Sequence, residues 1–444
     1  MKNTWKGLLL LLTLVLVGCN PSSETTATSQ PPGGDSESSG EVSLPTFENV
    51  ALTFGNPITG ADGTAMRRLV REFNEAYQGQ IQVTESFLPE VDFYESLVAT
   101  IPIKQSFDIA LIHSYRVPSF ANKDLLFPLD SLLSSTGVNI NRADYIGDVY
   151  DAMIWNNKQF GVPLDVHSIM LYYNKDLLSA HNVEVPTNRA ELIAAAKKMP
   201  QTNSGGWGLP LSTTWPSEYI FTTALYQNGG KEIDKDTLMP AFNSAAGVAA
   251  LRSVADLIHV EKISPLNVSV DADLLMFQQG KAMFHINGNW MLNSLVDSGI
   301  NFGVTSLADM FVETPTANSK KVASRSHTFV LPQGRNITLR QQAALVFIKY
   351  VTENAYLWAE SGGHIPASNI ARETEEYLAL PYHQTYGDVD IYKLNEPSPY
   401  YYEAFAPVFS RVTTAMSDAT YNAEALLAAA ADEGEQAVII AQLG

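Results

Sequence analysis

The sequence predicts an α/β fold, because segments with strand periodicity alternate with segments with helical periodicity. Val50–Phe54 and Ile81–Thr84 have the composition and spacing of strands. Between them, apolar residues recur at helical spacing, at Met66, Leu69, Val70, Phe73 and Tyr77. Val91–Ile101 follows as a second helix and Phe107–Ile112 as a third strand. This alternation is typical of parallel βαβ units with right-handed crossovers.

Polar and aromatic residues follow each of these predicted strands. Asn56 comes after the first strand, Glu85 after the second, and His113-Ser-Tyr-Arg116 after the third. Because the carboxyl ends of parallel strands meet at one edge of a sheet, where ligands bind, we expect these side chains to lie close together.

The length of the chain predicts two domains behind a flexible tether. Pro21–Gly40 is rich in Ser, Thr, Pro and Gly and lacks apolar periodicity, so residues 19–43 are expected to form a tether. From residue 44 onward, roughly 400 residues of ordinary hydrophobicity remain, which is more than one core usually holds.

The N-terminus has the pattern of an export signal. Lys2 and Lys6 precede an apolar run, Leu8–Val17, that is too short to span a membrane permanently. The run ends at Val17-Gly-Cys19, which resembles the signal of bacterial lipoproteins. Residues 1–18 would then be removed and Cys19 lipidated; the alternative is an ordinary secretory signal with a chance cysteine. As Cys19 is the only cysteine, disulfides within the chain and cysteine metal sites are excluded.

The charge of the chain excludes several classes of partner. The formal net charge is −19 at pH 7. An acidic surface argues against binding to nucleic acid or anionic lipid. The sequence contains no second apolar run of spanning length, so contact with a membrane is expected only through the lipid at Cys19.

The middle of the chain continues the alternation. A polar turn with Asp165 and His167 is expected to lead into a strand at Ile169–Tyr173. Three helices are predicted next. Thr187 is expected to cap the first, Trp215 and Tyr219 lie at the start of the second, and the third is long and Ala-rich, at Ala245–Ile263.

The stretch Phe277–Trp290 predicts a helix end, a strand and a turn. Gly280 suits the left-handed residue that often follows a helix, and Ala282–Ile286 is apolar enough for a buried strand of a parallel sheet. The strand runs into Asn287-Gly-Asn-Trp290. Trp290 would therefore lie past the carboxyl end of a strand, where ligands sit in open sheets. The alternative is a core residue of the next helix.

The last third of the chain predicts further strands and a helical tail. Strands are expected near Phe302–Val304 and Thr328–Leu331, and a helix through Ala344 and Val351. The connector Gly362–Pro366 follows, and then an Ala-rich helical tail with an aromatic cluster, Tyr400, Tyr401, Tyr402 and Phe405.

Four segments together resemble the extracellular solute-binding proteins of ABC importers, in the sugar-binding group that includes maltose-binding protein. The segments are Phe107-Asp-Ile with Leu125-Leu-Phe-Pro-Leu129; Gly161-Val-Pro with Leu171-Tyr-Tyr-Asn-Lys-Asp-Leu-Leu178; Asn228-Gly-Gly230; and Gly280-Lys-Ala-Met with Ile286-Asn-Gly-Asn-Trp290. Their order and spacing cover nearly the whole chain after the tether.

The resemblance implies a two-lobed periplasmic-binding-protein-like fold of type II, with hinge crossings between the lobes and the ligand in the cleft. Lobe one would comprise residues 44–160 plus 320–363, and lobe two residues 161–319 plus 364–444. The crossings would lie near Asn157–Pro163, Lys320 and Gly363-His364.

The resemblance also implies which residues line the cleft. In such proteins an aromatic ring after the Asn-Gly turn stacks on a sugar, which here is Trp290. The other expected ligand-binding residues are Asn289, Asn56, Glu85, Tyr115, Arg116, Asp165, His167, Trp215, Tyr219, His327 and Tyr402 (or Phe405). Two positions depart from maltose-binding protein, since His167 stands where it has an acidic residue and Tyr115 where it has an aspartate.

Each of these side chains also has a purely structural alternative. Asp165 and His167 could bond only to hinge backbone, and Glu85 could pair with Arg116. The aromatic residues at helix starts, Trp215, Tyr219 and Tyr402, could simply pack in a core.

The resemblance implies a non-catalytic binder that captures a mono- or oligosaccharide and delivers it to permeases with a cytoplasmic ATPase. It would act as a monomer, lipid-anchored in the cell envelope and facing the periplasm or the exterior, with neither cofactor nor metal. Alternatives are a binder of another solute, such as a polyamine or glycerol phosphate, a scaffolding lipoprotein, and an exported carbohydrate-active enzyme. The sequence contains neither Gly-x-Ser-x-Gly nor His-Glu-x-x-His, which disfavours the enzyme.

Overall fold

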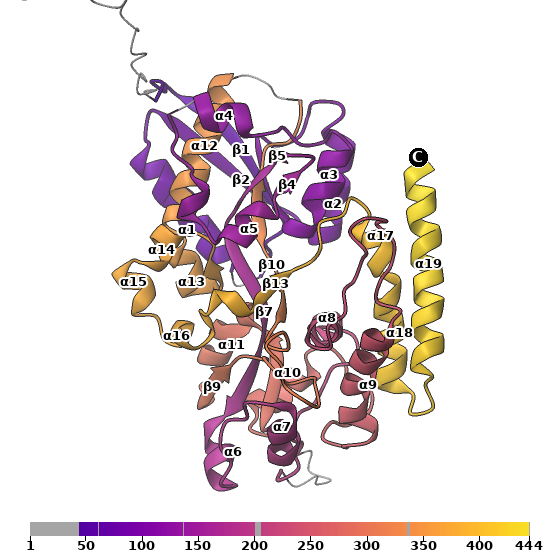
Figure 1. Cartoon of the computed structure of the whole chain (residues 1–444). Helices are drawn as coiled ribbons and strands as arrows, with labels where there is room; N and C mark the ends of the chain where they lie inside the picture. Colours follow the sequence, from indigo (N-terminus) through magenta and orange to yellow (C-terminus); the bar gives the residue numbers. More distant parts are fainter. Residues whose placement is uncertain (1–43, 61, 136, 200–205, 335–337, 444) are drawn as a thin grey trace, which may run out of the picture. The chain divides into compact units, whose positions relative to one another are not determined.

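A computed structural model describes residues 44–60, 62–135, 137–199, 206–334 and 338–443 (Figure 1). The expected signal, the tether and Cys19 lie outside the described residues. Within the described ranges, no helix combines the length and the apolar character needed to cross a membrane.

The first sheet has the strand order β2-β1-β3-β11-β6. Its strands are β1 (Val50–Asn56), β2 (Ile81–Phe87), β3 (Ile109–His113), β6 (Gly161–Pro163) and β11 (His327–Val330). β1 pairs in parallel with β2 and β3, which confirms the predicted βαβ units. β11 enters from far along the chain and runs antiparallel to β3 and β6.

Helices on both sides of the first sheet bury its apolar faces. They are α1 (Gly63–Ala76), α2 (Glu90–Thr100), α3 (Val117–Asn122), α4 (Asp130–Ser135), α5 (Gly147–Asp151), α12 (Thr338–Glu353) and α13 (Tyr356–Gly362). The ring centroid of Phe347 on α12 lies 5.4 Å from that of Phe54 on β1 and 5.0 Å from that of Phe73 on α1. The apolar stripe of α1 therefore packs against α12 and the sheet, as its helical spacing predicts. A short hairpin, β4 (Ile154–Trp155) with β5 (Lys158–Gln159), precedes β6.

The second sheet is built around one long strand, β7 (Asp165–Asn174). The other strands are β8 (Phe284–Gly288), β9 (Phe302–Thr305), β10 (Val322–Arg325), β12 (Ile365–Pro366) and β13 (Tyr392–Leu394). Two expectations are wrong here. Asp165 and His167 belong to β7 and do not form a turn, and β8 runs antiparallel to β7. An apolar run indicates only that both faces of a strand are buried. An antiparallel strand has the same composition as a parallel one when helices cover both of its faces.

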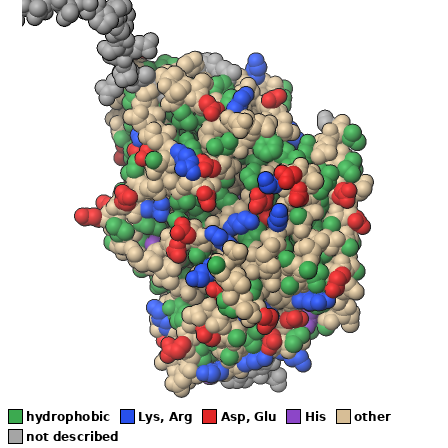
Figure 2. All heavy atoms as spheres, viewed as in Figure 1, with side chains coloured by type: hydrophobic (Ala, Val, Ile, Leu, Met, Phe, Trp, Pro, Cys, Tyr) green, Lys and Arg blue, Asp and Glu red, His purple; other side chains and the backbone are tan. Residues whose placement is uncertain are grey.

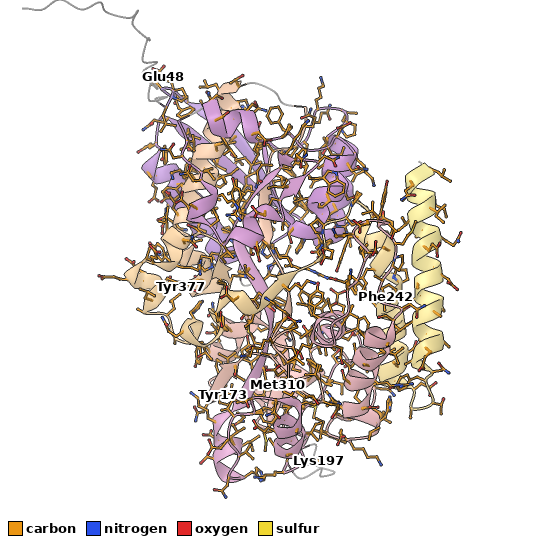
Figure 3. All side chains as sticks on the ribbon, in the orientation of Figure 1. Glu48, Tyr173, Lys197, Phe242, Met310 and Tyr377 are labelled. Carbon is orange, nitrogen blue, oxygen red and sulfur yellow. The ribbon has the colours of Figure 1, made fainter. Side chains whose placement is uncertain are left out.

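Two helices, α10 (Ala272–Gln278) and α11 (Leu292–Asp297), bury their apolar residues in the same cluster as those of the first sheet. The other helices beside the second sheet enclose a separate core. They are α6 (Lys175–Ala180), α7 (Arg189–Ala196), α8 (Ser217–Gln227), α9 (Ala245–His259), α17 (Tyr401–Phe405), α18 (Pro407–Ser417) and α19 (Ala423–Leu443). Phe242 and Met310, labelled in Figure 3, belong to this core, where Phe242 meets the ring of Phe405 at 5.6 Å. Asn188, and not Thr187, caps α7 by accepting a hydrogen bond from the Glu191 amide.

Within the described residues, three segments carry the chain between the two sheets. The first joins β6 to β7 at Leu164, the second joins β10 to β11 at Ser326, and the third joins α13 to β12 at Gly363-His364. The segments are bonded to one another, since the Leu164 amide donates to the His327 carbonyl at 2.8 Å. The chain then continues through α14 (Asn369–Arg372), α15 (Glu375–Leu378) and α16 (His383–Tyr386) to β13.

Candidate ligand-binding site

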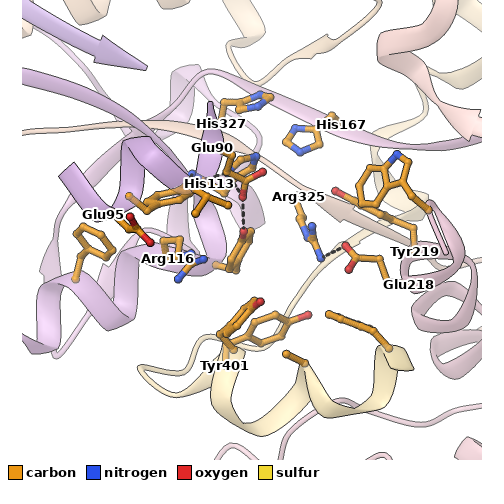
Figure 4. Close-up of a pocket in the computed structure, with 18 of the residues that line it drawn as sticks. Glu90, Glu95, His113, Arg116, His167, Glu218, Tyr219, Arg325, His327 and Tyr401 are labelled. Atoms are coloured by element: carbon orange, nitrogen blue, oxygen red, sulfur yellow. Dashed lines mark hydrogen bonds and ion pairs between the residues drawn. The ribbon is translucent and has the colours of Figure 1, made fainter. Parts of the chain in front are cut away.

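A cavity of about 860 Å³ opens where the elements of the two sheets meet (Figure 4). The first sheet's elements contribute side chains from α2, from the end of β3 and from β11, and the second sheet's from β7, α8, the end of β8 and α17. The polar and aromatic lining residues are Asp62, Glu90, Tyr94, Glu95, His113, Tyr115, Arg116, Phe120, His167, Trp215, Glu218, Tyr219, Trp290, Arg325, His327, His364, Tyr401, Tyr402 and Phe409.

Three aromatic rings form one wall of the cavity. The ring centroid of Trp290 lies 6.1 Å from that of Trp215 and 6.0 Å from that of Tyr219. Trp215 lines the cavity and remains 38% exposed, so part of this residue is accessible to a ligand. Gly288 makes this arrangement sterically feasible, because a Cβ there would lie 2.1 Å from the Trp290 indole.

One cation, Arg116, stacked on phenol rings forms the opposite wall. The guanidinium of Arg116 lies 4.6 Å from the ring centroid of Tyr94 and 5.0 Å from that of Tyr402. The hydroxyl of Tyr115 donates to Glu90 at 3.2 Å. These contacts hold Arg116 over aromatic faces, which stabilises a cation in a partly desolvated place.

A partly buried ion pair lies beside the aromatic wall of the cavity. Arg325 at the end of β10 donates to Glu218 at the start of α8 over 2.8 Å, and each side chain is only 17% exposed. The guanidinium also lies between two phenol rings, 4.8 Å from that of Tyr115 and 4.5 Å from that of Tyr219 (Figure 4). The pair thus presents fixed hydrogen-bonding groups beside the aromatic wall.

Asp165 organises the imidazoles at the base of the cavity. Its carboxylate accepts hydrogen bonds from the His327 amide at 2.8 Å and from the Trp358 indole at 2.7 Å. Nδ1 of His327 lies 2.7 Å from Oδ2 of Asp165, and Nδ1 of His167 lies 3.2 Å from Oδ1. Burial acts to raise the pKa of Asp165, but His327 and His167 hold that pKa well below its usual value. Burial lowers the pKa of His167 to about 3, so its imidazole is neutral.

Eight of the twelve residues expected to bind ligand line this cavity. They are Tyr115, Arg116, His167, Trp215, Tyr219, Trp290, His327 and Tyr402. The alternative residue, Phe405, is fully buried in the core of the second sheet's helices.

Four expected residues lie outside the lining. Asp165 is buried behind His167 and His327. Asn289 is buried and accepts from the Ser168 amide at 3.3 Å, which fixes the turn before Trp290. Asn56 donates to Glu85 at 2.8 Å and accepts from the Ile58 amide, so it orders the loop after β1.

Several lining residues are not among those predicted from the sequence, and Glu218 and Arg325 are the most informative of these. Glu218 lies between two residues that the sequence did single out, Trp215 and Tyr219. Arg325 comes two residues before His327, at the end of a strand the sequence analysis did not predict. The signal that could have identified both residues is a charged side chain within two positions of a predicted ligand contact.

Two sheets linked by three chain passages, with a cavity at the junction, define the class of two-lobed ligand-binding proteins. The family model "Bacterial extracellular solute-binding protein" matches residues 57–357, and the chain belongs to this family. This confirms the resemblance that the four sequence segments carry.

Relatives with curated names are distant and match in part. A maltotriose-binding protein of Pyrococcus abyssi is 24% identical over 225 residues, which are 50% of this chain and 46% of that protein. A maltooligosaccharide ABC transporter solute-binding lipoprotein of Streptococcus pneumoniae is 25% identical over 231 residues, 50% of this chain and 52% of that protein. The chain thus spans about half the length of the curated relatives it matches.

Solved structures match over most of the chain. The GacH receptor of Streptomyces glaucescens has a TM-score of 0.74 at 20% identity, covering 88% of this chain and 99% of that one. An ABC substrate-binding protein from Listeria monocytogenes in complex with cycloalternan has a TM-score of 0.73 at 19% identity, with the same coverage. These likenesses confirm the two-lobed α/β fold.

Proposed function

We propose that this protein captures a mono- or oligosaccharide in the cavity and delivers it to the permeases of an ABC importer, whose ATPase is cytoplasmic. The observation that supports this most is the wall of Trp215, Tyr219 and Trp290 beside the Arg325–Glu218 pair. A pyranose has an apolar C–H face that an aromatic ring covers and hydroxyl groups that charged side chains bond. The wall and the ion pair offer both at once.

The relatives support the same ligand class. The two curated relatives are named for maltotriose and maltooligosaccharides, and one solved relative was determined with cycloalternan. The cavity volume of about 860 Å³ is in the range of small-molecule sites. Trp290, Trp215, Tyr219, Tyr115, Arg116, His167, His327 and Tyr402 are the proposed contacts, to which Glu218 and Arg325 are added. We keep Asp165 and Asn289 as supports for these contacts.

The proposed mechanism is closure of two lobes around the ligand. The proposed hinge is formed by the passages at Leu164, Ser326 and Gly363. The boundaries implied by the resemblance then move by a few residues, because β6 pairs in the first sheet and β10 in the second. The proposed lobes are residues 44–163 plus 327–362 and residues 165–325 plus 364–443. Gly363 adopts a φ of +70°, which glycine tolerates without strain. Ligand favours the closed form because only there do both lobes contact it. No bond is broken, so the protein acts as a binder and not as an enzyme.

The proposal extends to the place where the protein acts. Lipidation of Cys19 anchors it to a bacterial membrane with residues 19–43 as the tether, and the folded part works as a monomer facing the periplasm or the exterior. The face in Figure 2 carries acidic and basic side chains interspersed, as expected for a surface exposed to water.

A polyamine is the second candidate ligand. The lining includes four carboxylates, those of Asp62, Glu90, Glu95 and Glu218, of which one is paired with Arg325. A cationic ligand would neutralise the others.

Calorimetry with a panel of maltooligosaccharides, other oligosaccharides and polyamines tests the proposal. We expect at least one sugar to bind, and Trp290→Ala to weaken its binding at least tenfold, or about 1.4 kcal/mol. Trp290→Phe should retain most of the affinity, because it keeps a ring for stacking. Trp155→Phe, on the hairpin β4–β5, is the control and should bind as the unmodified protein does. Binding of polyamines alone, or an unchanged affinity of Trp290→Ala, would overturn the sugar assignment.

A further inference from the structure

Four side chains at the base of the cavity converge from three separate chain segments. Asp165 and His167 come from β7, His327 from β11, and His364 from the segment between α13 and β12. All four are buried, with exposed fractions of 0%, 3%, 5% and 1% in that order. One potential ligand atom from each lies within 4.8 Å of the corresponding atoms of the others. We call this group the histidine cluster.

We propose that the histidine cluster binds one divalent transition-metal ion, such as Zn²⁺. Nδ1 of His327 and Nδ1 of His364 lie 2.7 and 3.4 Å from Oδ2 of Asp165, and Nδ1 of His167 lies 3.2 Å from Oδ1. Nitrogen and oxygen ligands of one zinc ion, each bonded at about 2.0–2.2 Å, lie roughly 3–3.5 Å apart. The distances from Asp165 to His167 and His364 fall in this range, and the cluster as a whole, whose ligand atoms lie within 4.8 Å of one another, would contract slightly around an ion.

An unpartnered nitrogen supports the assignment independently. Nδ1 of His364 is buried, faces Oδ2 of Asp165 at 3.4 Å and makes no hydrogen bond within the part of the chain that the structure describes. The Asp165 carboxylate is already engaged by two fixed donors, the His327 amide and the Trp358 indole, in addition to the nearby imidazoles. A buried ring nitrogen without a partner is unfavourable, and a bound cation would satisfy it.

The surroundings of the cluster fit a metal site. Nε2 of His364 lies 3.4 Å from Oδ2 of Asp62, which is the carboxylate contact that orients many metal-binding histidines. His364 is also stacked on Trp358, with ring centroids 4.5 Å apart. His167 and His327 line the cavity, so an ion has a path of entry.

The donor set selects the type of ion. Three imidazoles and one carboxylate suit zinc and its neighbours in the first transition series, whereas magnesium and calcium prefer oxygen ligands. The ion would tie together β7, β11 and the segment before β12, all of which take part in the passages between the sheets. Such an ion would brace the junction, whichever solute the cavity binds.

Metal titration of the full chain tests the proposal. The protein is stripped with a chelator and titrated with Zn²⁺ by calorimetry, and bound metal is counted by mass spectrometry after desalting. We expect one zinc per chain and a raised melting temperature. His364→Gln should weaken zinc binding at least tenfold, and His181→Gln, outside the cluster, should leave it unchanged.

A spectroscopic readout separates a metal site from a hydrogen-bonded network. Co²⁺ bound by this donor set should give visible d–d absorption, which His167→Gln should alter even if His364→Gln does not fold. Circular dichroism checks the fold of each variant. The proposal is overturned if the stripped protein binds no zinc, or if His167→Gln and His364→Gln bind it as tightly as the unmodified chain, which would indicate an adventitious ion only.

Discussion

Glu232 is a buried carboxyl group whose ionisation works against folding. The hydroxyl of Tyr226 donates to Oε1, and Oε2 is buried without a hydrogen-bond partner among the described residues. Burial raises the pKa of Glu232 from 4.5 to about 6. Between these values the unfolded chain has lost the proton that the folded protein still holds. Stability therefore falls as the pH rises from 4.5 to about 6, and stays reduced above it.

We predict that Glu232→Gln stabilises the protein at pH 8 and has little effect at pH 4. At pH 8 the raised pKa of Glu232 corresponds to a loss of about 2 kcal/mol in the free energy of unfolding, and the neutral amide of glutamine avoids this loss. Thermal unfolding of both proteins at the two pH values measures the difference. Glu435→Gln, at an exposed position of α19, is the control and should show no such pH dependence. An equal stability difference at pH 4 and pH 8 would contradict the prediction.

Single residues were predictable where a local pattern marked them. Trp290 follows an apolar strand and an Asn-Gly turn, and both features lie within a few residues of it. His364 carries no such mark, because the atoms it meets belong to Asp165 and Asp62, far away in the sequence. Convergence of this kind depends on the crossing of distant segments, which no local spacing reports.

The C-terminal helix α19 depends on a glycine for its packing. Gly434 lies in the helix interior, where alanine is normally more stable by about 1 kcal/mol. Here a Cβ would lie 2.4 Å from the Ala404 carbonyl oxygen on α17 and 3.0 Å from Cγ of Pro240. The glycine therefore permits the close approach of α19 and α17, visible at the right of Figure 1.

We predict that Gly434→Ala destabilises the protein by about 1–3 kcal/mol, because overpacking against a carbonyl exceeds the gain in helix propensity. Chemical denaturation measures the change. Ala429→Gly, at an exposed position of the same helix, provides the comparison, since it should lose only helix propensity, about 1 kcal/mol. An increase in stability of Gly434→Ala would show that the two helices are not in this close contact.

Element types were predictable from periodicity, but strand pairing was not. The apolar run before Trp290 correctly indicated a buried strand, although β8 begins at Phe284 and pairs antiparallel to β7. Burial on both faces gives the same composition in either orientation. Likewise, β7 includes Asp165 and His167, because buried partners compensate for polar side chains that would otherwise suggest a turn.

At the scale of the whole molecule, the proposed lipidation of Cys19 would decide where the protein works. We predict that Cys19→Ser abolishes lipidation and releases the protein from the membrane fraction. Growth of the producing bacterium with labelled palmitate, followed by fractionation, measures both effects. Ligand affinity should not change, because every residue that lines the cavity follows residue 44. Labelled, membrane-bound Cys19→Ser protein would mean that the chain is lipidated at another position, and an unmodified chain that is neither labelled nor membrane-bound would mean that the N-terminus is an ordinary secretory signal.

The division of the chain between two sheets was not predictable from composition or periodicity. β11 belongs to the first sheet although more than 150 residues of the chain, Asp165–Arg325, lie with the second. Only the family resemblance implied that the chain returns to the first lobe, because local sequence patterns do not indicate which sheet a strand joins. The sequence therefore indicated the class of fold, and the structure supplied the positions of the passages.

The pairing of β7 with β8 has a consequence for altering the choice of ligand. Ile169 pairs with Gly288, the Ser168 amide donates to Asn289, and the Tyr172 hydroxyl donates to the Gly288 carbonyl at 2.8 Å. His167 and Trp290 are therefore mounted on one rigid backbone ladder. An engineer who wants a different specificity on this side should exchange side chains at those two positions and leave loop lengths alone. On the opposite wall, where Arg116 and Tyr402 are carried by short helices, backbone redesign has more freedom.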